Sequence, residues 1–441
     1  MHTQVVRNDG MKRGGSLLYD PVESSRVAVT RHEGRSTQGN SRVLFVSNGA
    51  GEDEIACRLA TRLRARAGES LSIEGWSLVG AGDAYLASDI PSVRAINQLP
   101  SEGFGTLSLR SFLRDLRAGW VRVHAEQIRE ATRLRGRFDL VVAVGDVVPL
   151  AVALIARAPF ISIGCAKSVY YGPRYGFNAV ERWILKQGHA TCFTRDARTA
   201  RMMRKAGVHA RYVGNPVMDD LAPRGLEIPW RAAASVVACF PGSRSDRELN
   251  AVTILRLVAL ASDQWHRMGV LHLAFALPRR FELERFRSCL ENDPAASAWQ
   301  FTSTGGSSLT LQLGDLHASF THGALGDVLH RARVAIALGG TVNEQAIGCG
   351  VPCVTFATSG PQGRAYLRMK MPYFGESVME VPPSPTPLAN TVGRLLHDDV
   401  LHARMRRAGA ERMGRPDGGA TDSIVDAILQ RLEGDEQDKL P

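Results

Sequence analysis

Short apolar runs alternate along this chain with segments whose apolar residues recur every three or four positions. The run SRVLFVS, residues 41–47, is typical of a buried strand, and the segment 51–68 places Ile55, Leu59 and Leu63 on one face of a helix. The alternation continues to residue 214. Parallel strands need long crossover connections, so this order predicts a parallel sheet with helices between its strands. Further strands are expected at 71–80, 140–145, 160–164, 190–194 and 210–214, and helices at 107–135, 148–157, 178–188 and 195–207.

A stretch rich in proline and glycine, residues 214–230, interrupts this pattern, and the alternation then begins again. We therefore predict an α/β protein of two Rossmann-like domains, whose parallel sheets face a cleft and whose C-terminal helix crosses back. In the second half, strands are expected at 235–240, 271–277, 333–339 and 352–357, and helices at 246–267, 279–291, 324–332, 341–350 and within 385–435. The predicted limits are a disordered tail at 1–40, an N-terminal domain at 41–217, a linker at 218–230, a C-terminal domain at 231–415, and a helix with a tail at 416–441.

The polar N-terminal region lacks the apolar stretch of a signal peptide. The most apolar region, residues 138–166, is interrupted by Asp146 and Arg157, which leaves less than the roughly 20 apolar residues of a membrane span. We therefore expect a cytoplasmic protein, and the sequence leaves open a peripheral attachment to the inner face of the cytoplasmic membrane.

A formal charge of +10 favours anionic partners, such as a phosphate-bearing molecule or an acidic membrane surface. The segment 107–137 holds eight arginines and three acids. It is either an amphipathic helix that rests on an anionic membrane or a core-packing helix with a solvated basic face. The seven cysteines are scattered without a CxxC pair, so neither a zinc site nor a disulfide framework is expected.

The first candidate for chemistry is the loop Asn48–Gly49–Ala50, between a predicted strand and a predicted helix. Glycine allows a ligand to approach the backbone, and a helix N-terminus attracts anions. Glu52 and Asp53 at the helix start suit proton transfer from a hydroxyl, or a plain helix cap.

The second candidate is the turn at Gly242, Ser243 and Arg244, which follows the strand 235–240. A glycine turn before a helix forms an anion nest, and the arginine adds a fork suited to phosphate. Alternatively, Arg244 pairs with Glu248 on the surface of the following helix.

The third candidate is the turn Gly339–Gly340–Thr341, followed by Glu344 and Gln345. Its glycines again allow close approach, the threonine hydroxyl can donate to a phosphate, and a carboxylate can accept from a ribose diol. Alternatively, Thr341 and Glu344 form a capping box.

The fourth candidate is the loop 164–176 after a predicted strand. Its polar and aromatic side chains suit contact with a sugar or an acyl chain, although a purely structural loop is the open alternative. These residues are Lys167, Ser168, Tyr170, Tyr171 and Arg174.

The order and spacing of four motifs resemble the lipid-A-disaccharide synthase family, or an uncharacterised relative of it, over residues 42–430. They are FPGSR at 240–244, VGNP at 213–216, GGT at 339–341 with Pro352, and AKSVYY at 166–171. The family consists of glycosyltransferases of the GT-B architecture. The resemblance implies transfer of an N-acetylglucosamine-type sugar from a UDP-sugar to a lipid-linked acceptor, with inversion, and with neither a metal nor a cofactor.

The same resemblance implies roles for individual residues. The nucleotide-sugar would meet Gly242, Ser243, Arg244, Gly339, Gly340, Thr341, Glu344 and Gln345, and the acceptor would meet Asn48, Gly49, Lys167, Ser168, Tyr170 and Tyr171. Counted back from Pro352, the family's ribose-binding Glu falls on Gln345. Ala50 replaces the histidine that many such enzymes carry in the first loop. The candidate bases are therefore Asp53 first, then Glu52 and Asp146.

Other classes of function remain open. A UDP-sugar 2-epimerase shares the GT-B architecture, and a non-catalytic, membrane-associated binding protein could retain it. Nucleic-acid binding is the least favoured because the basic residues are spread along the chain without an aromatic–basic module. The sequence does not define the acceptor or the oligomeric state.

Overall fold

The computed structural model describes residues 41–79, 82–93, 120–172, 176–303, 308–360, 362–414 and 418–437, all within one compact unit at 35–441. The predicted tail 1–40, Arg174 and residues 107–119 of the predicted basic helix lie outside the described residues.

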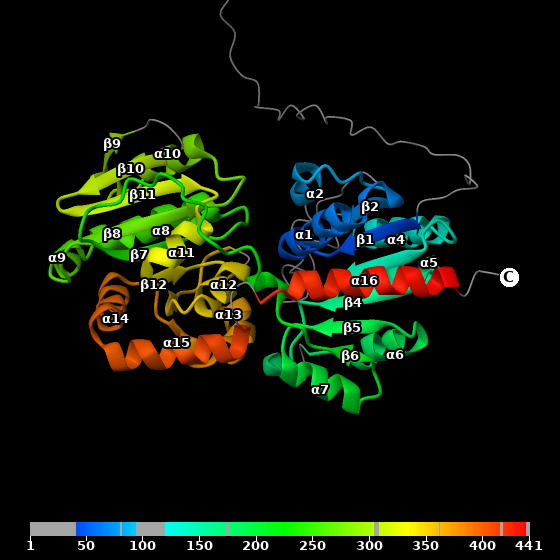
Figure 1. Cartoon of the computed structure of the whole chain (residues 1–441). Coiled ribbons are helices and arrows are strands. Elements are labelled where there is room, and N and C mark those ends of the chain that lie inside the picture. The colour runs from blue at the N-terminus through cyan, green and yellow to red at the C-terminus, as the bar shows by residue number, and fades with distance from the viewer. Residues whose placement is uncertain are drawn as a thin grey trace, which may run out of the picture. The chain divides into compact units, whose positions relative to one another are not determined.

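The first sheet is entirely parallel, as predicted, in the order β2-β1-β3-β4-β5-β6 (Figure 1). Its central strands β3 and β4 are buried along their whole length, because helices cover both faces. The strands are β1 (Ser41–Ser47), β2 (Leu71–Ser77), β3 (Leu140–Val144), β4 (Phe160–Gly164), β5 (Thr191–Thr194) and β6 (Ala210–Arg211).

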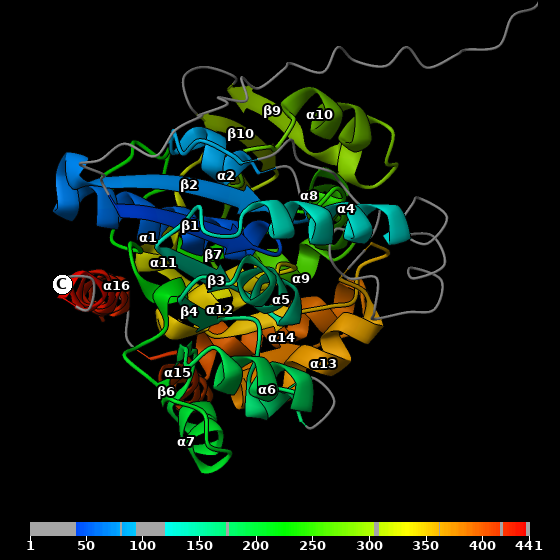
Figure 2. The same ribbon diagram turned by 90° about the vertical axis from the view of Figure 1, so that its right-hand side faces the viewer.

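Two helical layers cover this sheet, and each has its own apolar cluster. One layer holds α1 (Ala50–Ala67), α2 (Asp83–Ala87) and α16 (Ala420–Gln437), and the other holds α4 (Trp120–Arg133), α5 (Val147–Ala156), α6 (Ala179–Gln187) and α7 (Ala197–Lys205) (Figure 2).

The C-terminal helix crosses back, as predicted. Ile424, Val425 and Ile428 of α16 are fully buried in the cluster that contains Val43 and Leu63 of the first domain. The helix α16 is therefore part of the N-terminal core.

The second sheet has the order β14-β13-β12-β7-β8-β11-β10-β9. Its central strand β8 is buried at every position. The strands are β7 (Ser235–Phe240), β8 (Leu271–Leu277), β9 (Gln300–Ser303), β10 (Ser308–Leu313), β11 (Leu316–His322), β12 (Ala332–Ala337), β13 (Cys353–Thr355) and β14 (Val378–Glu380). The helices are α8 (Arg247–Ala259), α9 (Ser262–His266), α10 (Leu283–Glu291), α11 (Leu325–Arg331), α12 (Thr341–Gly348), α13 (Arg364–Phe374), α14 (Pro385–His397) and α15 (Asp399–Met413).

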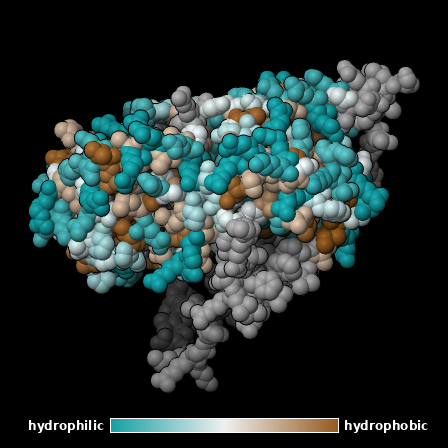
Figure 3. Space-filling model, turned by 90° about the horizontal axis from the view of Figure 1, so that it is seen from below, coloured by the Kyte–Doolittle hydropathy of each residue, from teal (hydrophilic) through white to brown (hydrophobic). Residues whose placement is uncertain are grey.

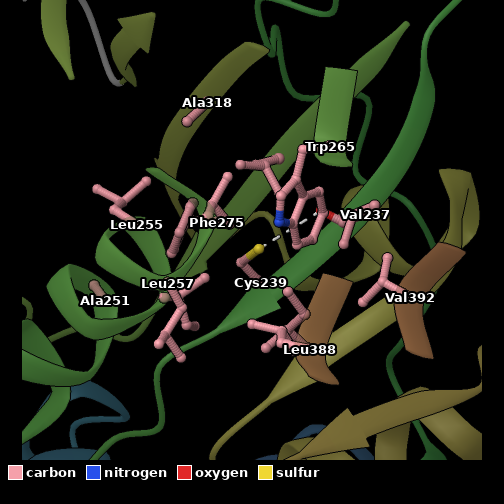
Figure 4. Packing of buried hydrophobic residues seen from close by; sticks show 14 of the residues in the cluster. Val237, Cys239, Ala251, Leu255, Leu257, Trp265, Phe275, Ala318, Leu388 and Val392 are labelled. Atoms are coloured by element: carbon pink, nitrogen blue, oxygen red, sulfur yellow. Dashed lines mark hydrogen bonds between the residues drawn. The ribbon is translucent and has the colours of Figure 1, made fainter. Parts of the chain in front are cut away.

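The core of this sheet is built around Trp265 and Phe275, which are at most 1% exposed (Figure 4). Cys239 lies among them with its Sγ 3.7 Å from the carbonyl oxygen of Val237. The seven cysteines all lie within the described residues, and none of them forms a disulfide bond.

The second sheet differs from the prediction at one edge, because β10 pairs in antiparallel fashion with both β9 and β11. Leu309 and Leu311 alternate with polar residues before a turn at Gly314–Asp315, which is a hairpin signal. The expected single helix at 246–267 is also two helices. A turn at residues 260–261 redirects the chain and brings Trp265 into the core.

Candidate functional site

Each sheet contains one point at which the strand order reverses. In the first sheet it lies between β1 and β3, and in the second between β7 and β12. Ligands of open α/β sheets bind beyond the carboxyl ends of the strands at such points. Three of the candidate loops and the candidate base Asp146 follow these four strands, one after each, so the topology groups them in two pairs.

Close contacts hold each pair together. In the first domain, Asn48 Nδ2 donates to Asp146 Oδ1 over 2.8 Å. In the second, a Cβ atom on Gly242 would lie 3.7 Å from Gly339 Cα, and the φ angle of Gly242 is +90°. Only glycine adopts this turn without strain.

The two pairs also meet each other. A Cβ atom on Gly51, at the start of α1, would lie 2.8 Å from the hydroxyl oxygen of Thr341, at the start of α12. The predicted acceptor-side and nucleotide-side loops are therefore in direct contact.

Glu52 lies against two glycines, Gly49 and Gly145, at the junction where the loops of the two domains meet. A Cβ atom on Gly49 would lie 2.7 Å from Glu52 Oε2, and one on Gly145 would lie 3.5 Å from its Cγ. Burial raises the pKa of the Glu52 carboxyl above its usual value, against the lowering effect of its own backbone N–H and of the Arg244 charge. Asp146 adds a smaller raising effect and Lys370 a smaller lowering one.

Asp53, the other acid of this helix start, is directed into the first domain and is only 2% exposed. Its carboxylate accepts from the hydroxyls of Ser47 (2.5 Å) and Ser77 (2.9 Å), and the Ser47 hydroxyl is 2.6 Å from Tyr85 OH. Burial raises the pKa of Asp53 to about 7. Asp53 thus joins β1, β2 and α1, while Glu52 faces the junction.

Asp146 is the N-cap of α5. It accepts from the backbone N–H of Val148 (3.1 Å) as well as from Asn48. Two predicted site residues, Asn48 and Asp146, therefore hold the first-domain loops to each other.

The alternative for the FPGSR turn put Glu248 on a helix surface beside Arg244. The structure instead buries Glu248 completely. Its carboxylate pairs with Arg247 (2.9 Å) and accepts from the backbone N–H of Glu282 (3.0 Å). Glu248 therefore links α8 to the start of α10, and the charge of Arg244 acts on Glu52 and on Tyr366. Ser243 of the same turn is exposed.

The capping-box alternative for the third loop is wrong, because α12 begins at Thr341 with Gly340 as its N-cap and without a side-chain cap. Glu344 is 2% exposed and pairs with Arg195, and with Lys370 at 3.0 Å. Gln345 donates to the carbonyl oxygen of Val217 (3.2 Å).

The loop at 164–176 makes internal and domain-joining contacts. Lys167 pairs with the buried Glu181 (3.2 Å), and the Ser168 hydroxyl donates to Asp196 (2.8 Å). The hydroxyl of Tyr171 accepts from both Arg195 and Lys370 at 2.7 Å. Tyr170 lies under the guanidinium of Arg412, 3.8 Å from its ring centroid.

Two cations at the junction were not predicted, Arg195 and Lys370. Arg195 immediately follows β5, so the rule that identified the other loops could have found it. Lys370 lies on α13, a helix that the sequence pattern did not reveal.

The described residues also bear on metal ligation and on membrane insertion. Across the described ranges, no three His, Cys, Asp or Glu side chains are grouped so that they could hold a metal ion. No helix in the described part of the chain is long and apolar enough to span a bilayer.

Comparison with known proteins identifies the fold. No protein-family model and no curated protein matches the sequence. Among solved structures, the chain is similar to a putative UDP-N-acetylglucosamine 2-epimerase from Listeria monocytogenes at a TM-score of 0.53, with 13% identity over 90% of this chain and 98% of that one. It is also similar to CalG4, the calicheamicin glycosyltransferase, at a TM-score of 0.54, with 16% identity over 89% and 98% of the two chains. MurG from Acinetobacter baumannii gives 0.50, with 14% identity over 88% and 99%.

These similarities define the architecture. The fold is GT-B, with two Rossmann-like α/β domains, as the sequence predicted. At identities this low, the similarity shows the fold alone.

Proposed function

We propose that this chain is a glycosyltransferase that moves an N-acetylglucosamine-type sugar from a UDP-sugar to a lipid-linked acceptor. The observation that supports it most is that opposite charges lie at the two points where the strand order reverses, an acid in the first domain and cations in the second. The half-buried carboxyl of Glu52 stands in the electric field of Arg244 and Lys370 from the second domain. An acid opposite two cations is the arrangement that proton removal and diphosphate departure require.

In the proposed reaction, Glu52 accepts the proton of the acceptor hydroxyl, whose oxygen attacks the anomeric carbon of the sugar. The bond from that carbon to the diphosphate breaks, UDP leaves, and the configuration is inverted. Arg244, Lys370 and the N-termini of α8 and α12 stabilise the negative charge of the leaving diphosphate, so no metal is needed.

A ribose contact by Glu344, which is the acid one residue before the position that the resemblance gives, needs one rearrangement. The carboxylate of Glu344 is engaged by Arg195 and Lys370. Binding a ribose diol would require Glu344 to exchange one of these partners for the diol hydroxyls.

The second candidate is a UDP-sugar 2-epimerase. It is favoured by the similarity to the Listeria monocytogenes structure and to a Neisseria meningitidis UDP-GlcNAc 2-epimerase bound to UDP-GlcNAc, at a TM-score of 0.52. Both candidates use the same nucleotide, so they differ in whether an acceptor is needed.

The test is incubation of the full-length protein with UDP-N-acetylglucosamine, with and without a panel of lipid acceptors, and with Glu52→Gln as the control. A transferase releases UDP only when an acceptor is present, and NMR of the product gives the anomeric configuration. Formation of a second UDP-sugar without acceptor would establish the epimerase instead. Nucleotide binding without turnover in either condition would indicate a non-catalytic protein.

A further inference from the structure

A cavity of about 230 Å³ opens on the first domain, at the end of the sheet where the strands begin. It is lined by Ile161 and Thr191, from the amino-terminal ends of β4 and β5, whereas the candidate loops follow the carboxyl ends of strands. Since β4 has five residues, the strand alone separates these two ends by roughly 16 Å. The cavity is therefore distinct from the candidate site at the junction of the two domains.

The walls of the cavity come from the turn after α6, from β6 and from the C-terminal helix. A Cβ atom on Gly188, which ends α6, would overlap the ring of Phe160, so glycine lets this ring lie against the turn. The next residue, His189, has a φ angle of +45° and lines the cavity. On the opposite wall, α16 runs across the sheet beside β4 and contributes Gln430 and Arg431 (Figure 1).

The charged side chains of the cavity are of one sign. Arg211, at the end of β6, and Arg431 are both exposed, and His189 adds an imidazole to the same lining. The hydroxyl of Thr191 lies 3.1 Å from Nδ1 of His209, so a second imidazole stands next to the lining. No carboxylate lines the cavity, and within the described part of the chain neither arginine forms an ion pair.

The acids of α16 up to residue 434 lie on another side of the helix. Asp422 and Asp426 form ion pairs of 3.0 and 2.7 Å with arginines of α1. Glu433 is seven positions after Asp426, so it lies within roughly 20° of the same side, whereas Arg431 lies about 140° around the helix from Asp426. These acids therefore do not neutralise the cavity.

Shape and charge together distinguish the cavity from the surface that Figure 3 shows. On that face, hydrophobic residues are scattered among hydrophilic ones, which is ordinary for a protein surface. Scattered residues of this kind do not by themselves define a binding site. The cavity instead combines a concave form with two guanidinium groups from different elements, Arg211 and Arg431.

We propose that this cavity binds a small phosphate monoester. Two guanidinium forks suit the oxygens of a phosphate group, which carries about −1.5 to −2 charges at neutral pH. Phe160 and Ile161 offer apolar contact to the carbon skeleton of such a ligand. The volume is below the roughly 300–1,000 Å³ of pockets for drug-sized ligands, so the ligand is smaller than a nucleotide-sugar. The inference goes beyond the proposed glycosyl transfer and does not depend on it.

A phosphate bound here would connect α16 to the first sheet through Arg431 and Arg211. On its other side, α16 is already held by the two ion pairs with α1. Its first turn is held to the segment between the domains, since the backbone N–H of Thr421 donates to Asp219 over 2.6 Å. Because a ligand that binds only the folded state stabilises it, occupancy should raise the midpoint of thermal unfolding.

The test is calorimetric titration of the full-length protein with glycerol 3-phosphate, in the absence of any UDP-sugar. We expect binding of glycerol 3-phosphate and no binding of glycerol, which lacks the phosphate. Arg211→Gln and Arg431→Gln should each weaken binding by about 10- to 100-fold, the usual effect of losing a hydrogen bond to a charged group. Arg431→Lys, which keeps the charge but not the fork, should weaken it less.

Two control variants locate the ligand. Arg407→Gln removes an exposed arginine of α15, and Arg244→Gln removes the arginine of the candidate site, and both should bind glycerol 3-phosphate as the wild type does. Thermal unfolding without ligand should be alike in the cavity variants and the wild type. Wild-type affinity in both cavity variants would overturn the proposal, as would loss of binding in Arg244→Gln, which would place the phosphate at the junction. Tighter binding of succinate than of glycerol 3-phosphate would overturn the assignment to a phosphate ester.

Discussion

Arg195, directly after β5, forms an ion pair with Glu344 of α12, and the side chains of both residues are almost completely buried. The pair joins the two Rossmann-like domains, and Lys370 and Tyr171 add further hydrogen bonds to it. It therefore connects the candidate nucleotide side of the junction to the first domain.

Breaking this pair should strongly destabilise the protein. Arg195→Met leaves the charge of Glu344 buried with only Lys370 to compensate it, and such losses amount to about 3–5 kcal/mol in the free energy of unfolding. Urea unfolding measures the loss. The control is Arg404→Gln, which removes the exposed pair between Arg404 and Glu376 (3.3 Å) and should change stability by less than about 1 kcal/mol. Equal effects of the two variants would contradict the role given to Arg195.

Arg244 of the FPGSR turn and Arg247 of α8 should have different effects when they are replaced. Arg244→Gln should weaken UDP binding by about 10- to 100-fold, since a hydrogen bond to a charged group contributes about 1.5–3 kcal/mol. Arg247 donates to the carbonyl oxygens of Arg280 (2.7 Å) and Arg244 (3.0 Å). Arg247→Gln should therefore lower the free energy of unfolding more than it lowers the affinity for UDP. Calorimetric titration with UDP, alongside thermal unfolding, separates the two effects. Wild-type affinity in Arg244→Gln would remove Arg244 from the site.

Replacing the carboxyl of Glu52 should abolish most activity while UDP still binds. Glu52→Gln should lower kcat about 10²- to 10⁴-fold, the usual contribution of a positioned base. Since burial raises the pKa of Glu52, wild-type kcat should rise with pH as this group loses its proton. Glu54→Gln is the matched control, because Glu54 is an exposed acid of the same helix. Full activity in Glu52→Gln would remove Glu52 from the candidate bases and leave Asp53 and Asp146.

Asp53 should make stability depend on pH. Its folded pKa of about 7 exceeds the ordinary value of 3.8, so between these values the folded state binds more protons than the unfolded state. Stability conferred by the protonated carboxyl is then lost as pH rises through this window, by up to about 1.4 kcal/mol per pH unit. Urea unfolding from pH 4 to pH 8 should show this decline in the wild type. Asp53→Asn should flatten the decline, and an identical slope in the variant would show that Asp53 does not cause it.

Sequence patterns were sufficient for most of the fold. The parallel strands β1, β3, β4, β7 and β8 are apolar runs between helical segments, and they could be located because both faces of such strands are buried. The pattern of apolar and polar residues did not locate elements that are short or that depart from the alternation of strands and helices. The helix α13 contains Pro372, and β14 is three residues long. In the edge hairpin, apolar and polar residues alternate with a period of two.

For the candidate site, the sequence by itself determined which loops could hold a ligand, because glycine turns and capping acids after strands are local signals. It placed Glu52 and Asp53 side by side and ranked Asp53 first as the candidate base. Only the tertiary structure decided that Asp53 binds Ser47 and Ser77 inside the first domain, while the charge of Arg244 acts on Glu52. The order of strands in each sheet, and the contacts between the two domains, depend on pairings between residues far apart in the chain. For the same reason the sequence did not show that Arg195 and Lys370 converge on Glu344 from different elements.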